Sequence, residues 1–200
     1  GSTGDDVMDG GDGSDVMFIG ESGDAVHDSG ASGYDKAMIY AAAGVSIAVG
    51  GWSGVERVVG FTGDDTIDAT GAGVSITLTG GAGNDTLIGG GGADALFGGA
   101  GNDAIFGGVG GDTLLGADGA DVLNGAAGND ALGGGAGADS FVFDSGWGQD
   151  VVMDFTDDED LIDLSGVAGV SSTTDLVISQ NGADTIITLA GGGTDRITLT

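Results

Sequence analysis

The sequence predicts an all-β fold of stacked nine-residue repeats, and three observations support this prediction. Residues 80–142 divide without gaps into seven blocks of nine residues. Every block carries aspartate at its sixth place and a large apolar residue at its eighth place. The composition, with 47 glycines and no proline in 200 residues, fits neither an average globular protein nor collagen, which needs glycine at every third position. A fixed period of this kind indicates a repeat architecture.

The charge of the chain indicates that it needs bound cations. There are 32 acidic residues against three basic ones, which gives a formal net charge of −29. This charge argues against nucleic acid and anionic membranes as partners, and it opposes compaction unless cations neutralise it. No apolar run approaches the roughly 18 residues needed to span a bilayer, so we expect no membrane insertion. Hard carboxylate oxygens favour calcium over softer metals. The chain has no cysteine, so neither a disulfide nor a thiolate metal site can hold the fold together.

The seven blocks fix which residues face the ions and which fill the core. They read GGAGNDTLI, GGGGADALF, GGAGNDAIF, GGVGGDTLL, GADGADVLN, GAAGNDALG and GGAGADSFV. Because side chains alternate along a strand, the eighth-place residue of each short strand should point into the core. These core residues are Leu87, Leu96, Ile105, Leu114, Leu123, Leu132 and Phe141.

The blocks resemble the G-G-x-G-x-D-x-U-x repeat of the RTX (haemolysin-type) calcium-binding proteins. The resemblance implies that the first six residues of a block form a turn and the last three a strand, so that two blocks complete one coil of a right-handed parallel β-roll. It further implies the C-terminal β-roll module of a type I-secreted protein, one that folds when it meets calcium outside the cell.

Successive turns alternate between the two edges of such a roll, so aspartates 18 residues apart should stack about 4.8 Å apart. Asp85, Asp103, Asp121 and Asp139 form one expected ladder, and Asp94, Asp112 and Asp130 form the other. Their gaps predict at least five calcium ions, each held by carboxylates and turn carbonyls. The alternative is that aspartate and glycine merely form turns, which does not explain an apolar eighth place.

The full set of predicted ligands extends beyond the seven blocks. The predicted carboxylate ligands are Asp6, Asp15, Asp65, Asp85, Asp94, Asp103, Asp112, Asp121, Asp130, Asp139 and Asp150. The accompanying backbone carbonyls are those of Gly80, Gly83, Gly89, Gly92, Gly98, Gly101, Gly107 and Gly110. Asp24 and Asp35 lie in weaker copies of the repeat and are alternatives. Residues 154–163 form an acidic cluster that is either ligating or a solvated face.

The repeats suggest four parts. Residues 1–38 form a short N-terminal repeat block, residues 39–59 a β-strand insert whose alternating pattern lacks the nine-residue period, and residues 60–142 the main roll. Residues 69–79 replace one block without an aspartate, so their coil should lack one ion. Residues 143–200 form the region of C-terminal capping strands and, by the resemblance, the secretion signal.

For function, we expect a calcium-binding, calcium-folded β-roll of a structural protein of surface-layer or adhesin type, and not an enzyme. The expected location is extracellular, either secreted or on the bacterial cell surface. The chain has no H-E-x-x-H or G-x-S-x-G motif, and His27 is its one histidine. The alternative is the non-catalytic C-terminal RTX module of a secreted protease, lipase or alginate epimerase. By the resemblance, type I secretion machinery is an expected partner.

The ninth places predict exposed apolar stripes on the two sheets, with Phe97 and Leu115 on one and Ile88, Phe106 and Val142 on the other. The insert or the C-terminal hairpins should cover one stripe. The other is expected to bind a partner or a second copy.

Overall fold

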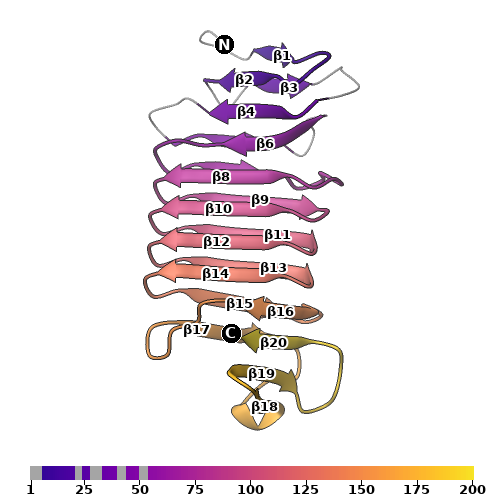
Figure 1. Cartoon of the computed structure of the whole chain (residues 1–200), viewed down its shortest axis with the longest axis vertical. Coiled ribbons are helices and arrows are strands. Elements are labelled where there is room, and N and C mark those ends of the chain that lie inside the picture. Colours follow the sequence, from indigo (N-terminus) through magenta and orange to yellow (C-terminus); the bar gives the residue numbers. More distant parts are fainter. Residues whose placement is uncertain (1–5, 21–23, 28–32, 40–43, 50–53) are drawn as a thin grey trace.

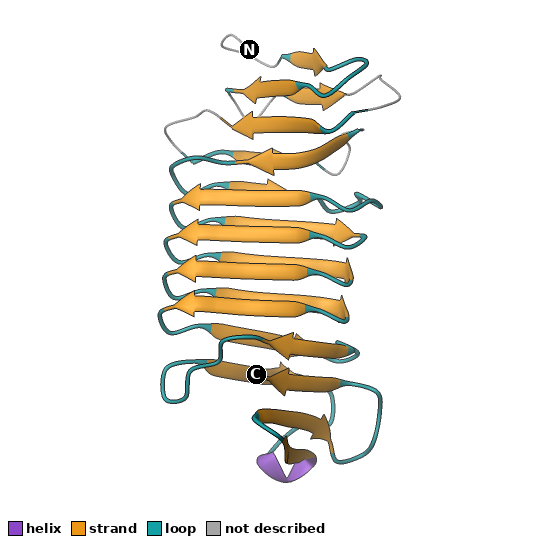
Figure 2. Cartoon of the chain, in the orientation of Figure 1, coloured by secondary structure: helices purple, strands orange, loops and turns teal. Residues whose placement is uncertain are grey.

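The computed structural model describes residues 6–20, 24–27, 33–39, 44–49 and 54–200. It confirms the all-β, parallel β-solenoid predicted from the repeats: the chain winds into coils that place one strand in each of two facing sheets (Figures 1 and 2). In the described part, η1 (Thr173–Asp175) is the sole helix. No helix in this part is long and apolar enough to cross a membrane.

The larger sheet, which we call the long sheet, has 11 strands. In spatial order they are β2 (Val16–Ile19), β4 (Asp35–Ile39), β6 (Val55–Val59), β8 (Thr77–Ala82), β10 (Ala95–Ala100), β12 (Thr113–Asp118), β14 (Ala131–Ala136), β16 (Gln149–Val152), β20 (Arg196–Leu199), β19 (Asp184–Leu189) and β18 (Leu176–Asn181). From β2 to β20 all neighbours are parallel, whereas β18, β19 and β20 form an antiparallel end.

The second sheet, which we call the short sheet, has seven parallel strands. They are β5 (Ser46–Ala48), β7 (Thr66–Asp68), β9 (Thr86–Gly91), β11 (Ala104–Gly110), β13 (Val122–Gly128), β15 (Ser140–Asp144) and β17 (Leu161–Gly166). At the N-terminal end, β1 (Val7–Asp9) and β3 (Ala25–His27) form a separate parallel pair.

The core between the sheets consists of the eighth-place residues, as predicted. Leu87, Leu96, Ile105, Leu114, Leu123, Leu132 and Phe141 are all fully buried. Their strands pair in register 18 residues apart, as in Leu96 with Leu114, so identical places stack in columns. Burying each such side chain stabilises the fold by about 1.5–3 kcal/mol. The strands from β8 to β14 are six or seven residues long and not the three that the resemblance implied, because the first places of the next block continue each strand. Repeated many times, these strands build a continuous core.

Glycine has two different tasks in the blocks. The second place has positive φ throughout the seven blocks, even where Ala117 (φ 88°) and Ala126 (φ 65°) stand there. The first place does not lie in the left-handed region. It is glycine because a Cβ on Gly98 would overlap the carboxylate of Asp103 and approach the Gly116 carbonyl oxygen to 2.9 Å.

The structure corrects the separate insert expected at residues 39–59. Its described strands belong to the roll, since β4 and β6 pair within the long sheet and β5 pairs with β7 in the short sheet. Coils here repeat every 20 or 21 residues, as in Val16 with Lys36 and Lys36 with Arg57. Longer turns hide the nine-residue period without disturbing the stacking of the strands.

The C-terminal boundary also moves. β16 and β17 continue the roll past residue 142, and the antiparallel cap begins only at β18. β18 and β19 form an antiparallel hairpin, one of the C-terminal hairpins expected from the sequence. This hairpin extends the long sheet at its end instead of covering an apolar stripe, as Figure 1 shows.

Candidate metal centre

Stacked carboxylates line both edges of the roll, each at the turn before a strand. In one ladder the backbone N–H of Asp85 donates to Oδ1 of Asp103 at 2.7 Å, and the same bond links Asp103 to Asp121 and Asp121 to Asp139. In the other, Asp94 donates to Asp112 and Asp112 to Asp130, both at 2.8 Å. The predicted stacking at intervals of 18 residues is therefore confirmed.

The ladders extend beyond the seven blocks. On the first edge Asp65 donates to Asp85 and Asp139 donates to Asp160. On the second edge Asp130 donates to Asp150, and Asp15 to Asp35 near the N-terminus. Asp6 pairs with Asp24 between β1 and β3. All 11 predicted aspartates thus occupy equivalent positions, and the structure adds Asp24, Asp35 and Asp160 to them.

One ladder residue could not be found from the repeat. Oε2 of Glu56 accepts the N–H of Asp35 at 2.7 Å, in the position that an aspartate takes elsewhere. A register shift between Asp35 and Lys36 places Glu56 there. The nonapeptide motif specifies an aspartate at a fixed place, so it does not predict a glutamate that reaches the ladder from a β-bulge.

Each ladder has one interruption within the described residues. Val45 donates its N–H to Oδ1 of Asp65, and Ile76 donates to Oδ1 of Asp94, so apolar residues occupy these two places. Both side chains are buried. The missing aspartate foreseen in residues 69–79 corresponds to Ile76, and the break at Val45 was not anticipated.

The second carboxylate oxygen of the ladder aspartates is the feature that points to a cation. Oδ2 is buried and has no hydrogen-bond partner at a set of ladder positions, namely Asp6, Asp15, Asp85, Asp94, Asp103, Asp112, Asp121, Asp130, Asp139 and Asp150. A buried charged oxygen without a partner is strongly unfavourable, and a bound cation removes this penalty. The arrangement therefore fits a divalent ion.

Backbone carbonyls lie beside these oxygens. The Cβ position of Gly80 is occupied by the Asp85 carboxylate and lies 2.8 Å from the carbonyl oxygen of Gly98, one coil further on. The same relation joins Gly107, Asp112 and the Gly125 carbonyl oxygen. No group of three or more metal-binding side chains occurs among the described residues. A cation here would consequently take carboxylates from two coils and complete its shell with carbonyl oxygens, which suits calcium.

Burial shifts the pKa values of the ladder carboxylates upward. Burial raises the pKa of Asp85, Asp94, Asp103, Asp130 and Asp139 to about 6, against the lowering effect of the N–H that each accepts. Burial also raises the pKa of Asp150 to about 7, and the neighbouring Asp130 and Asp195 add to this. Without a cation, these groups therefore bind protons more readily than free carboxylates do.

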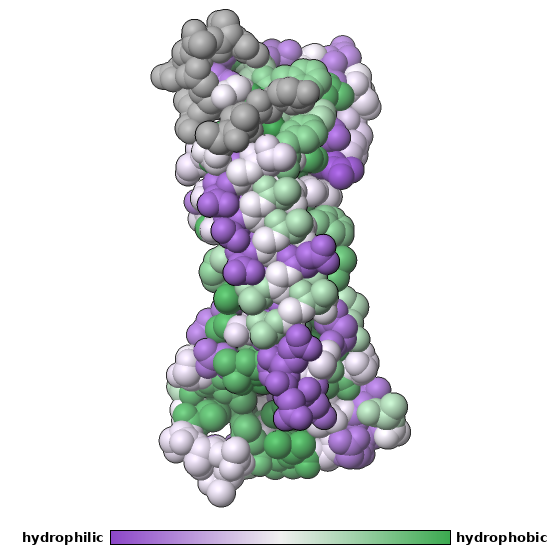
Figure 3. Space-filling model, turned by 90° about the vertical axis from the view of Figure 1, so that its left-hand side faces the viewer, coloured by the Kyte–Doolittle hydropathy of each residue, from purple (hydrophilic) through white to green (hydrophobic). Residues whose placement is uncertain are grey.

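A second polar ladder runs outside the first. The N–H of Asn102 donates to Oδ1 of Asn84, and the N–H of Ala120 donates to Oδ1 of Asn102, both at 2.8 Å. Figure 3 views this turn edge, where β8, β10, β12 and β14 end, and hydrophilic residues form columns along it. The recurring asparagine before the aspartate was the signal for this ladder, which the sequence interpretation did not use.

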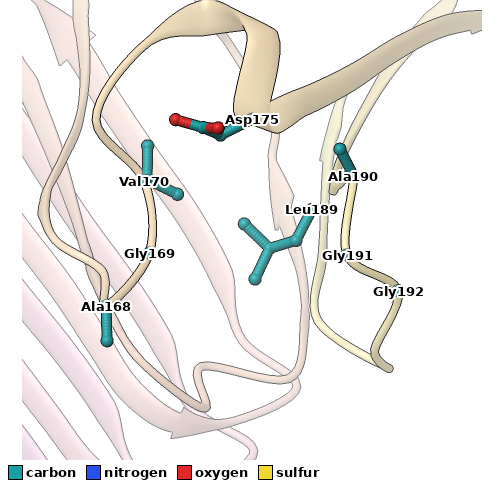
Figure 4. Close-up of a pocket in the computed structure, with 8 residues that line it drawn as sticks. All are labelled: Ala168, Gly169, Val170, Asp175, Leu189, Ala190, Gly191 and Gly192. Atoms are coloured by element: carbon teal, nitrogen blue, oxygen red, sulfur yellow. The ribbon is translucent and has the colours of Figure 1, made fainter.

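The cap contains a cavity of about 400 Å³ away from the ladders (Figure 4). Its lining is mostly glycine and small apolar residues, with Asp175 as the charged member. Oδ2 of Asp175 accepts hydrogen bonds from Ser171 and Ser172, so this oxygen is satisfied locally. This cavity lacks the unpartnered buried oxygens of the ladders.

Comparison with known protein families agrees with this geometry. A family model of the RTX calcium-binding nonapeptide repeat matches residues 1–24, 77–105 and 106–141. No curated protein sequence matches the chain. Among solved structures, the chain is similar to the AlgE6R3 subunit of the Azotobacter vinelandii mannuronan C5-epimerase, with 30% identity, a TM-score of 0.42, and coverage of 58% of this chain and 71% of that one.

The family model covers the seven uninterrupted blocks and the first two N-terminal copies. Both regions carry the sixth-place aspartates whose second oxygen is buried and unpartnered. On the repeat, the fold and the family match together, the chain belongs to the RTX calcium-binding nonapeptide repeat family and is a β-roll module of that family.

Proposed function

We propose that the chain is a calcium-folded β-roll of a secreted or cell-surface structural protein, of surface-layer or adhesin type. The observation that carries this proposal is the pair of ladders of buried Oδ2 atoms without partners. The calcium ligands are the 11 aspartates predicted from the sequence, together with Asp24, Asp35, Glu56 and Asp160. The first- and fourth-place carbonyls of Gly80, Gly83, Gly89, Gly92, Gly98, Gly101, Gly107 and Gly110 supply further oxygens, for at least five ions.

Calcium acts as the folding switch of this module. Without it, stacked carboxylates about 4.8 Å apart repel one another, and ordering 47 glycines is entropically expensive. Each bound ion brings two positive charges to a pair of carboxylates, so its binding free energy becomes folding free energy. A chain that stays unfolded where calcium is scarce and folds where it is millimolar suits export before folding. Type I secretion machinery and an extracellular location are part of this proposal.

A calcium titration followed by far-UV circular dichroism tests the switch. The calcium-free chain should show a disordered spectrum, and the β signal should develop cooperatively as calcium is added. Magnesium is the matched control ion, because it carries the same charge but demands a smaller octahedral shell and keeps its water. A complete β signal in calcium-free buffer, or equal folding with magnesium, would contradict the proposal.

We further propose that the module has no catalytic activity of its own and that its role is structural. The competing function is a non-catalytic RTX module that serves the secretion and folding of an attached enzyme. The coding sequence upstream of Gly1 distinguishes the two: more repeats or sandwich domains support the surface protein, and a catalytic domain supports the enzyme module.

A further inference from the structure

The outward face of the long sheet differs in charge from the rest of this acidic chain. Residues at the seventh and ninth places of β2, β4, β6, β8, β10, β12, β14 and β16 point away from the core, because their neighbours at the eighth place are buried. We call these 16 positions the long-sheet face. Registers align Val16, Lys36, Arg57 and Thr77 in one column, and Phe18, Met38, Val59 and Thr79 in the other. This face turns toward the viewer in Figure 1.

None of these 16 positions is acidic, although the chain has 32 acidic residues. Two of the three basic residues, Lys36 and Arg57, stand in its seventh-place column. The short sheet provides the contrast, since Asp68 and Asp163 occupy its equivalent ninth places. The long-sheet face also exposes apolar side chains, with Phe18 49% exposed, Phe97 36% and Met153 40%. Its composition is that of an interface and not of a solvated acidic surface.

The charges on and beside this face differ between its two ends. Lys36 and Arg57 lie toward the N-terminal end, on β4 and β6. Near the other end the carboxylate of Asp154 accepts the N–H groups of Gly134 and Gly135 at 3.0 Å, beside β14. A half-turn about an axis along the strands, between β8 and β10, places β4 of one chain opposite β14 of its partner. It also places β2 opposite β16 and β6 opposite β12.

We infer that two copies of this chain associate in calcium through their long-sheet faces, with the two solenoids antiparallel. Lys36 of each copy then faces Ala131 of the partner, two residues along β14 from Gly133, whose Cβ position lies 3.4 Å from Oδ2 of Asp154. The ninth-place columns face each other, with Phe18 opposite Met153. The contact is the same patch on both copies, so the assembly closes as a dimer. A second copy is the occupant that the charges favour, because it supplies the basic end and the acidic end together.

The size of the face indicates a weak dimer. Eight strands spaced about 4.8 Å apart span roughly 34 Å, and three residues across a strand span about 10 Å. This area is below the roughly 800 Å² per partner of a standard stable interface. Bound calcium is required, because the bare charge of −29 would keep two copies apart. Association should therefore become visible only at high protein concentration.

Sedimentation equilibrium over a concentration series in calcium measures this association. Phe97→Asp should weaken dimerisation at least tenfold, because it puts a charge at the centre of the face. Phe106→Asp is the matched control: Phe106 is the equivalent ninth-place residue of the short sheet and is 37% exposed. Circular dichroism in calcium checks that both variants fold. Equal weakening by the two substitutions, or a strict monomer at millimolar concentration, would overturn the inference and leave the face to another partner.

Disulfide trapping tests the orientation without relying on loss of binding. The chain has no cysteine, so Lys36→Cys and Ala131→Cys each introduce a single thiol. Ala131 is the seventh-place residue of β14, and β14 lies opposite β4 in the antiparallel dimer. Oxidising a mixture of the two variants should give mainly mixed dimers. A predominance of Lys36→Cys homodimers would instead indicate parallel solenoids and overturn the proposed geometry.

Discussion

The roll from β8 to β15 and the coils before β8 share one architecture but differ in how regularly they are built. In the first region, strands pair at intervals of 18 residues and aspartate fills every ladder place that follows β8. In the second, the intervals between paired strands from β2 to β8 are 20 or 21 residues, and Val45, Glu56 and Ile76 replace aspartate. The comparison shows that the strands still stack when the turns are longer. Most aspartates with a buried, unpartnered Oδ2 lie where the turns are shortest.

Removing calcium should have the largest effect, and the loss of amide protection should differ between the two regions. At 100 times the Kd, each ion contributes about 2.7 kcal/mol, so three ions contribute about 8 kcal/mol, comparable to the whole stability of a domain. Hydrogen exchange should show amides of β9 to β14 losing nearly all protection in calcium-free buffer. The amides of β4 to β6 should lose less protection, because their protection in calcium is already lower. The buried Val45 and Ile76 take ladder places in and beside these coils, which therefore gain less from calcium. Equal losses in both regions would remove the distinction.

Acid should partly replace calcium in the regular region. The folded-state pKa values of about 6 to 7 lie above the unfolded value of about 3.9. The calcium-free folded state therefore binds more protons than the unfolded state between about pH 4 and pH 7, and its stability falls as pH rises through that range. Resin-treated, calcium-free protein should show more β signal at pH 4 than at pH 8. A signal that increases with pH would contradict this sign.

Asp121→Asn tests a single shared ligand. Asparagine keeps an oxygen for the N–H of Asp103 but loses the charge that two neighbouring ions share. We expect about 2–3 kcal/mol lower stability at saturating calcium and a higher calcium midpoint in circular dichroism. Asp118→Asn is the control, because Asp118 lies in the same coil with an exposed side chain. A comparable effect of both substitutions would mean that total charge, and not ligation, sets the calcium requirement.

Gly98→Ala tests the first-place glycine. Its Cβ would overlap the Asp103 carboxylate, so we expect about 1–3 kcal/mol of destabilisation in urea unfolding with calcium present. Gly73→Ala provides the comparison, since Gly73 has no atom within 4 Å of a Cβ position and no positive φ. That control should stay within about 1 kcal/mol of the parent protein. A neutral Gly98→Ala would show that the coils can spread at the ion sites.

Ile76→Asp should restore a carboxylate at one interrupted ladder place, and we expect it to change the stability of the fold least. It restores a carboxylate between Glu56 and Asp94, beside a cavity of about 220 Å³. The lost burial of Ile76, worth about 1.5–3 kcal/mol, roughly offsets the gain from a new ion. Equilibrium dialysis should therefore find one additional calcium ion at nearly unchanged stability. An unchanged ion count would show that Glu56 does not serve as a ladder ligand.

Much of the site was predictable because the repeat sets each residue's place relative to its neighbours. Asp103, at the sixth place of its block, lies in a ladder at the turn edge, and Ile105, at the eighth, lies in the core. Glu56 and Asp160 were not predictable in this way. Glu56 reaches its ladder through a register shift, and Asp160 closes a loop in which its carboxylate also accepts the N–H of Thr156.

The insert expected at residues 39–59 illustrates the same limit. Its alternating pattern correctly indicated strands, but pattern alone does not tell which strand pairs with which. β6 pairs with β4 because β4, in the preceding coil, forms the free edge of the long sheet. The turns here vary in length, so the sequence shows no fixed period from which this pairing could be predicted. The C-terminal hairpin was likewise recognised as antiparallel, while its end-on position was not.

The sequence by itself determined the calcium-binding repeat, the two ladders and the apolar columns of the core, because all of these depend on spacing along the chain. The tertiary structure alone decided where the ladders continue and break, and that the long sheet presents an outward face without acidic residues. These features depend on which strands become neighbours, and that choice is made by packing across coils 18 to 21 residues apart.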